Sequence, residues 1–128
     1  MKTIIRLVIV SLMMVIAAPA YSESFSTFLK CEQDDEASSQ DLQAVASKWL
    51  KAAKQMKGGD KLEVYLHFPI VAQMGETDFA FVLVAPSLAE WGVFMDGYEG
   101  SAAQSHDAEW DELAACPDSA LFRSVKIK

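Results

Sequence analysis

The sequence contains two histidines, His67 and His106, whose imidazole groups are suited to proton transfer near neutral pH. His67 follows Tyr65 by two residues in a segment that alternates apolar and polar residues, so both are expected on its polar side. In that position they could line a cavity and bind a ligand, or His67 could act as a general base. An ordinary half-exposed strand histidine is the simpler interpretation.

The second histidine begins an acidic stretch that contains Asp107, Glu109 and Asp111. His106 and Glu109 are three residues apart, and Asp107 and Asp111 are four apart, so a helix would bring them together only as two separate pairs. A specific divalent-metal site usually takes three or four converging ligands. The stretch is therefore predicted to be a solvated acidic face, with no metal site and no cofactor.

The sequence carries no established catalytic pattern. It lacks G-x-S-x-G and a glycine-rich phosphate loop, so no catalytic residue is assigned and enzyme activity is left open. Trp91, in a helical segment, and Tyr98, between acidic neighbours, complete the candidate ligand-binding residues with Tyr65 and His67. Tyr98 is expected to be exposed at the rim of a site. All three tryptophans lie on apolar stripes of the expected helices, so they are predicted to face the core: Trp49, Trp91 and Trp110.

Cys31 and Cys116 are the only two cysteines of the chain. They show no C-x-x-C spacing and have no neighbouring histidine, which disfavours a redox or metal-binding pair. In an exported protein such a pair is most simply a structural disulfide. A functional thiol pair remains the alternative.

Residues 1–20 have the pattern of a secretory signal peptide. A basic start is followed by an apolar run over 7–18 and by small residues at Ala18 and Ala20. Cleavage is predicted after Ala20, with Ser22 as the alternative, because a membrane-spanning helix needs about 20 apolar residues. The mature protein is therefore expected in the periplasm or outside the cell, without a membrane anchor.

The charge of the mature chain excludes some partners. Removal of residues 1–20 takes away Lys2 and Arg6 but no acidic residue, so nine basic residues would remain against 18 acidic ones, a net charge of −9. Such a chain has no net field that attracts nucleic acid or anionic lipid. Residues 21–128 are enough for one domain with a single core.

Alternating and helical apolar patterns predict the elements of this domain. Strands are expected at 25–30, 61–71, 77–84 and 119–127, and helices at 40–57, from 87 onward and at about 105–115. The first helix carries a basic row whose role is left open between a solvated face and a docking patch: Lys48, Lys51, Lys54 and Lys57.

The order of these elements, β-α-β-β-α-β, matches the split βαβ arrangement. This predicts an α+β fold of the ferredoxin-like type, with a four-stranded antiparallel sheet in the order 4-1-3-2 and the helices on one face. In that layout the end of the first strand lies beside the start of the last. Cys31 and Cys116 are expected at these two positions, so the topology agrees with a disulfide between them.

The strand at 77–84 is apolar on both faces, so its second face also needs a cover. Ala80, Val82 and Val84 are the candidates for that face, and a second copy of the chain is the expected cover. In element order and in this doubly apolar strand the chain resembles the dimeric α+β barrel superfamily. Its ending, at 121–126, and Trp91-Gly92 are similar to those of small exported proteobacterial proteins of unknown activity.

Three functions follow from the residues and the resemblance. The favoured one is an exported, non-catalytic binding or assembly domain, acting as a homodimer with a small-molecule or protein ligand. The barrel superfamily also includes oxygenases and isomerases, which implies a second possibility: an enzyme with a pocket near His67, Tyr65 and Trp91. The third, a metal- or haem-handling protein, depends on the two histidines alone.

Overall fold

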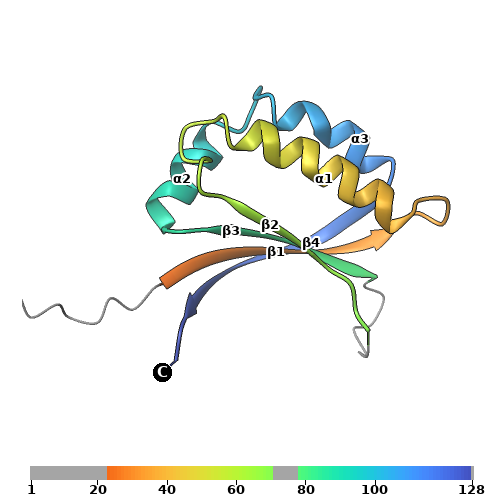
Figure 1. Cartoon of the computed structure of the whole chain (residues 1–128), viewed down its shortest axis with the longest axis horizontal. Helices are drawn as coiled ribbons and strands as arrows, with labels where there is room; N and C mark the ends of the chain where they lie inside the picture. The colour runs from red at the N-terminus through yellow and green to blue at the C-terminus, as the bar shows by residue number, and fades with distance from the viewer. Residues whose placement is uncertain (1–22, 71–77, 128) are drawn as a thin grey trace, which may run out of the picture.

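The computed structural model of the chain describes residues 23–70 and 78–127, which form two layers, a sheet and a set of helices on one of its faces (Figure 1). The predicted signal peptide and residues 71–77, which join the second and third predicted strands, lie outside the described residues. The strands are β1 (Glu23–Gln33), β2 (Glu63–His67), β3 (Phe79–Ala85) and β4 (Ala114–Val125). The helices are α1 (Ser39–Ala53), α2 (Leu88–Asp96) and α3 (Asp107–Asp111), and a 3-10 turn, η1 (Gln104–His106), precedes α3.

The four strands are antiparallel and lie in the order β2-β3-β1-β4. This is the predicted order 4-1-3-2, and it confirms the ferredoxin-like α+β fold class. In the described part of the chain, no helix is both long and apolar enough to cross a membrane.

Helix α1 begins at a capping box. The Ser38 hydroxyl accepts from the backbone N–H of Asp41, and the Asp41 carboxylate accepts from the backbone N–H of Ser38. The helix ends at Ala53, four residues before the predicted end at 57. Gly58 has a φ of +80° and makes the turn that leads to β2. The residues between Ala53 and Gly58 belong to this turn and are no longer α-helical.

The last strand is longer than predicted. It begins at Ala114 and not at 119, because Ala114 pairs with Gln33 and Ala115 with Glu32 of β1. The expected helix at 105–115 is correspondingly shorter, since α3 ends at Asp111.

Cys31 and Cys116 form a disulfide, as predicted, that connects residues 85 positions apart. Cys116 lies within β4 and not before it, opposite the bulge that shifts the β1–β4 register between Lys30 and Glu32. Cys31 is fully buried. The disulfide therefore lies inside the sheet and joins two neighbouring strands.

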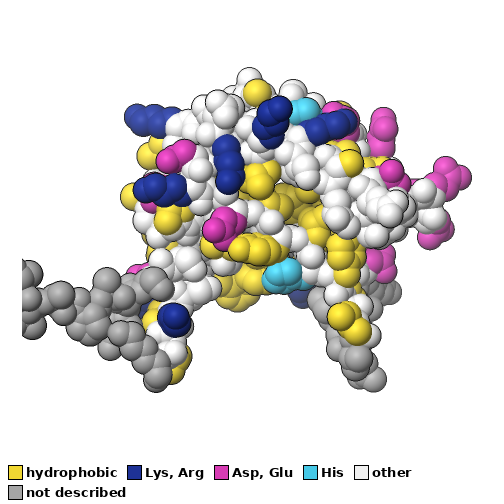
Figure 2. Space-filling view, in the orientation of Figure 1, with side chains coloured by type: hydrophobic (Ala, Val, Ile, Leu, Met, Phe, Trp, Pro, Cys, Tyr) yellow, Lys and Arg dark blue, Asp and Glu magenta, His cyan; other side chains and the backbone are white. Residues whose placement is uncertain are grey.

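The core lies between the sheet and the helices. Alternate residues of β3, from Phe79 to Ala85, point towards the helices, and Leu42 of α1 and Phe94 of α2 pack against them with no exposed surface. The helix layer does not fill this space completely. On the face drawn in Figure 2, hydrophobic side chains line a recess between α1 and the sheet.

Candidate ligand-binding cavity

A cavity of about 520 Å³ lies between the sheet and the helices. Strands β1, β3 and β4 supply its floor, and α1, α2, the turn after α2 and α3 supply its walls. This volume is in the range of about 300–1,000 Å³ that is usual for small-molecule sites. Most of its lining is apolar or aromatic, with the main aromatic residues being Trp49, Phe81, Trp91, Phe94, Tyr98 and Trp110.

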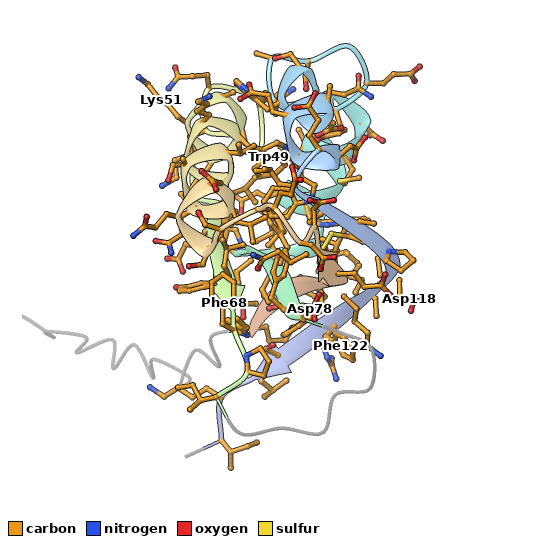
Figure 3. The ribbon with its side chains drawn as sticks, turned by 90° about the vertical axis from the view of Figure 1, so that its right-hand side faces the viewer. Trp49, Lys51, Phe68, Asp78, Asp118 and Phe122 are labelled. Carbon is orange, nitrogen blue, oxygen red and sulfur yellow. A yellow bond between two sulfur atoms is a disulfide. The ribbon has the colours of Figure 1, made fainter. Side chains whose placement is uncertain are left out.

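Trp49 forms the wall contributed by α1. It belongs to the apolar stripe of the helix, and Figure 3 shows it between α1 and the helices opposite. Its ring meets Phe81 of β3 edge-on at 5.7 Å and Phe94 of α2 at 5.9 Å between centroids. Such edge-to-face contacts fix the position of the indole ring.

The other two tryptophans are each held by a hydrogen bond to a strand. The indole N–H of Trp91, on α2, donates to the Thr27 hydroxyl of β1 at 3.1 Å. The indole N–H of Trp110, on α3, lies 3.4 Å from the sulfur of Cys116. One tryptophan thus comes from each helix, and all three line the same cavity.

Polar groups gather at one side of this cavity. The Trp49 indole N–H donates to the hydroxyl of Tyr98 at 2.8 Å, and that hydroxyl donates to the Asp107 carboxylate at 2.6 Å. Burial, followed by the hydrogen bond to Asp107, raises the pKa of Tyr98 far above its usual range. The raised pKa favours the neutral form of Tyr98, which donates its proton to Asp107.

His106 lies in the wall beside Asp107. Its Nδ1 is 3.0 Å from one carboxylate oxygen of Glu109, and the other oxygen accepts from Lys48 of α1 at 2.7 Å. Lys48, and to a smaller extent His106, lower the pKa of Glu109. This network joins α3 to α1. Among the residues that the structure describes, no three metal-ligating side chains are grouped together.

The basic row, which runs from Lys48 in α1 to Lys57 beyond the end of the helix, does not line the cavity. Lys48 pairs with Glu109 across its edge, while Lys51, Lys54 and Lys57 are exposed. Figure 3 shows Lys51 pointing away from the rest of the protein. These side chains are thus exposed in this chain, and the choice between a solvated face and a docking patch stays a prediction.

The opposite face of the sheet carries no helix and is largely apolar at its centre. Val82 of β3 lies between Tyr65 of β2 and Phe28 of β1, its direct partners in the sheet. Phe122 of β4 meets Phe28 edge-on at 5.3 Å, and His67 lies 6.1 Å from the same ring. We call this surface, made by Phe28, Tyr65, His67, Ala80, Val82, Val84 and Phe122, the open face.

The structure divides the four sequence candidates between these two surfaces. Trp91 and Tyr98 line the cavity, whereas Tyr65 and His67 lie on the open face, on the other side of the sheet. The prediction of one pocket shared by His67, Tyr65 and Trp91 is therefore wrong, because the sheet separates Trp91 from the other two residues. The reason is the strand alternation itself, because Tyr65 and His67 point away from the face that the helices cover.

Several residues of the cavity were not singled out for ligand binding in the sequence. Trp49 and Trp110 were assigned to the core, His106 and Asp107 to a solvated face, and Tyr98 to an exposed rim. Tyr98 is in fact half-buried and hydrogen-bonded on both sides. The signal that could have identified the cavity is the presence of one tryptophan on the sheet-facing stripe of each helical segment.

No protein-family model matches the chain, and no curated protein matches it. Solved structures do resemble it. A hydroxynitrile lyase from Passiflora edulis is 9% identical, with a TM-score of 0.52 over 84% of this chain and 95% of the lyase. SnoaB, a cofactor-independent oxygenase from Streptomyces nogalater, is 9% identical, with a TM-score of 0.51 over 84% of this chain and 97% of the oxygenase.

A third solved structure is a DABB-family protein with a ferredoxin-like fold from Mesorhizobium loti. It is 10% identical and gives a TM-score of 0.49 over 83% of this chain and 98% of the other. At such identities the likeness concerns the fold and not the activity. The sheet order and the two structures with TM-scores above 0.5 support the fold alone: a ferredoxin-like α+β architecture, as the sequence predicted.

Proposed function

We propose that the protein is an exported binding domain that holds a small, largely apolar molecule in the cavity and acts as a homodimer through the open face. The cavity carries the first part of this proposal. It combines a ligand-sized volume with rings that are already fixed by hydrogen bonds and edge-to-face contacts. A site whose walls are ordered before binding loses less entropy when the ligand enters.

The open face supports the second part. Phe122 is 51% exposed and Tyr65 is 48% exposed, whereas Val82 beneath them is already shielded at 3%. The exposed rings are thus the surface that a partner would cover. Lys30 lies directly opposite Asp118 on the same face, so a second copy can offer each charge its opposite.

Figure 3 shows Phe122 on the side of the sheet away from the helices. The oligomeric state is tested by light scattering after size-exclusion chromatography. The wild type is expected at twice the chain mass, and Phe122→Glu at the monomer mass. Leu121→Glu is the matched control, because Leu121 is its neighbour in β4, is similarly exposed at 41% and points to the other side of the sheet. A monomeric wild type would contradict the dimer.

The cavity is tested with a neutral fluorescent probe, N-phenyl-1-naphthylamine. All three tryptophans of the chain line the cavity, so energy transfer from them reports binding there. Ser119→Phe, which places a ring in the cavity floor, is expected to abolish the transfer. Ser47→Phe, on the exposed side of α1, should leave it unchanged. Failure of the wild type to bind this probe and the two further compounds named below would contradict a binding cavity.

An enzyme is the second candidate, and the Tyr98–Asp107 pair favours it. A phenol that donates to a carboxylate inside an apolar cavity is able to hold or pass on a proton at the Tyr98 oxygen. The structurally similar oxygenase and lyase make this candidate worth testing in the same cavity. The test is turnover that disappears in Tyr98→Phe while probe binding is retained.

A further inference from the structure

We propose that the ligand of the cavity is an organic cation: an ammonium group attached to an apolar body. This inference rests on the proposed binding function and specifies the chemical class of its ligand. Three features of the cavity lead to it. They are the way the tryptophans are bonded, the charges of the lining and the separation of polar from apolar walls.

The tryptophans can offer the ligand only their ring faces and apolar edges. The indole N–H of Trp49 already donates to Tyr98, that of Trp91 to Thr27, and that of Trp110 is directed to Cys116. None of the three N–H groups is left to bind an acceptor on the ligand. The π faces of indole rings carry partial negative charge and attract cations, with quaternary ammonium groups among the best-recognised ligands.

The charged groups of the lining favour the same class. Asp107 and Asp111 both line the cavity, and no lysine or arginine is found among the described residues that line it. His106 also belongs to the lining, with its Nδ1 directed to Glu109. A carboxylate or phosphate would meet acidic side chains without a basic partner, whereas an ammonium group would find two carboxylates.

The apolar body of such a ligand would lie on a different part of the cavity from its ammonium group. Leu29, Phe81 and Leu83 form an apolar part of the floor, while Tyr98, His106, Asp107 and Asp111 form the polar side. A ligand with a charged head and an apolar body would satisfy both parts at once. A small hydrated cation would leave the floor uncovered, and a neutral hydrocarbon would leave the carboxylates without a partner.

The test compares two compounds of almost the same shape, benzyltrimethylammonium and its neutral isostere neopentylbenzene, in which carbon replaces nitrogen. Binding is measured by quenching of tryptophan fluorescence at constant ionic strength. The cation is expected to bind at least about tenfold more tightly than the isostere. Trp49→Leu and Asp111→Asn should each weaken the cation several-fold while the affinity for the isostere changes less in Asp111→Asn.

Asp35→Asn is the control, because it removes an exposed carboxylate from the turn before α1 and not from the cavity or the open face. It should leave the affinity for the cation unchanged. Equal affinities for cation and isostere would overturn the inference and leave the proposed binding function intact. The inference also fails, with the binding function intact, if N-phenyl-1-naphthylamine binds but benzyltrimethylammonium does not. Failure of all three compounds to bind would overturn the binding function as well.

Discussion

Tyr98 donates its hydroxyl proton to Asp107 across 2.6 Å, and through this bond the turn after α2 is tied to α3 at the wall of the cavity. The same oxygen accepts from Trp49 of α1. One phenol thus connects three separate segments of the helix layer. It acts together with the Lys48–Glu109 ion pair, which also joins α1 to α3, to hold this wall of the cavity.

Removal of the Tyr98 hydroxyl tests how much it contributes to the stability of the fold. Tyr98→Phe leaves the half-buried indole N–H of Trp49 without its acceptor, and we expect a loss of about 1–3 kcal/mol in the free energy of unfolding. The measurement is urea denaturation. Tyr65→Phe is the control, because the Tyr65 hydroxyl bonds to Glu63 at the surface of the chain. Both substitutions are compared in the Phe122→Glu background, so that dimerisation does not contribute. An equal effect of both substitutions would contradict a special role for Tyr98.

The raised pKa of Tyr98 predicts a dependence of stability on alkaline pH. The ordinary pKa of tyrosine, about 10, applies to the unfolded chain. Above that pH the unfolded chain releases the Tyr98 proton while the native protein retains it, so this group favours unfolding increasingly as the pH rises. Below about pH 10 its contribution to stability is fully present and constant.

The check is a series of urea denaturation curves between pH 8 and pH 11 for the wild type and Tyr98→Phe. The wild type should lose more stability above about pH 10 than the variant does. Absorbance at 295 nm gives a second measure. Since native Tyr98 stays protonated, Tyr98→Phe should ionise as many phenols as the wild type before unfolding begins. Parallel pH profiles of stability would refute the prediction.

Most of the fold could be predicted because it follows from local patterns and element order. The alternation in β2, the apolar run of β3 and the β-α-β-β-α-β order together predicted the observed sheet. The start of β4 could not be predicted in this way. Ala114 and Ala115 continue the helical pattern of Trp110, and only their pairing with β1 makes them a strand.

The cavity was harder to predict because it depends on the spacing of layers. Periodicity showed that Trp49, Trp91 and Trp110 face the sheet, but it does not show whether their rings fill the space above it. Tyr98 was misjudged for a related reason. Its neighbours Asp96 and Glu99 suggest an exposed loop, and its contacts with Trp49 and Phe94 come from other segments of the helix layer.

The disulfide is expected to contribute strongly to stability. It closes a loop between residues 85 positions apart, which in the chain-entropy model corresponds to about 4–5 kcal/mol. The double variant Cys31→Ser/Cys116→Ser should unfold at a correspondingly lower urea concentration than the oxidised wild type. Reductant should destabilise the wild type and leave the double variant unchanged. A loss below about 1 kcal/mol would mean that β1 and β4 hold together without the bond.

Two glycines with positive φ allow a matched test of how α2 is positioned. Gly58 has a φ of +80°, and a Cβ atom there would lie 2.7 Å from the carbonyl oxygen of Glu90 and 2.9 Å from the backbone nitrogen of Phe94. Gly100 has a φ of +73° but nothing within 4 Å of the corresponding position. Both share the backbone cost of a side chain at positive φ, and only Gly58 adds a collision with α2.

Gly100→Ala should therefore cost about 1–2 kcal/mol, which is the usual penalty for a left-handed conformation. Gly58→Ala should cost about 2–4 kcal/mol, because α2 must also move away from the turn after α1. This movement would shift Trp91 and Phe94 in the cavity wall, so Gly58→Ala should weaken binding of the fluorescent probe and Gly100→Ala should not. Equal losses of stability in the two variants would show that α2 is not held in place by its contact with Gly58.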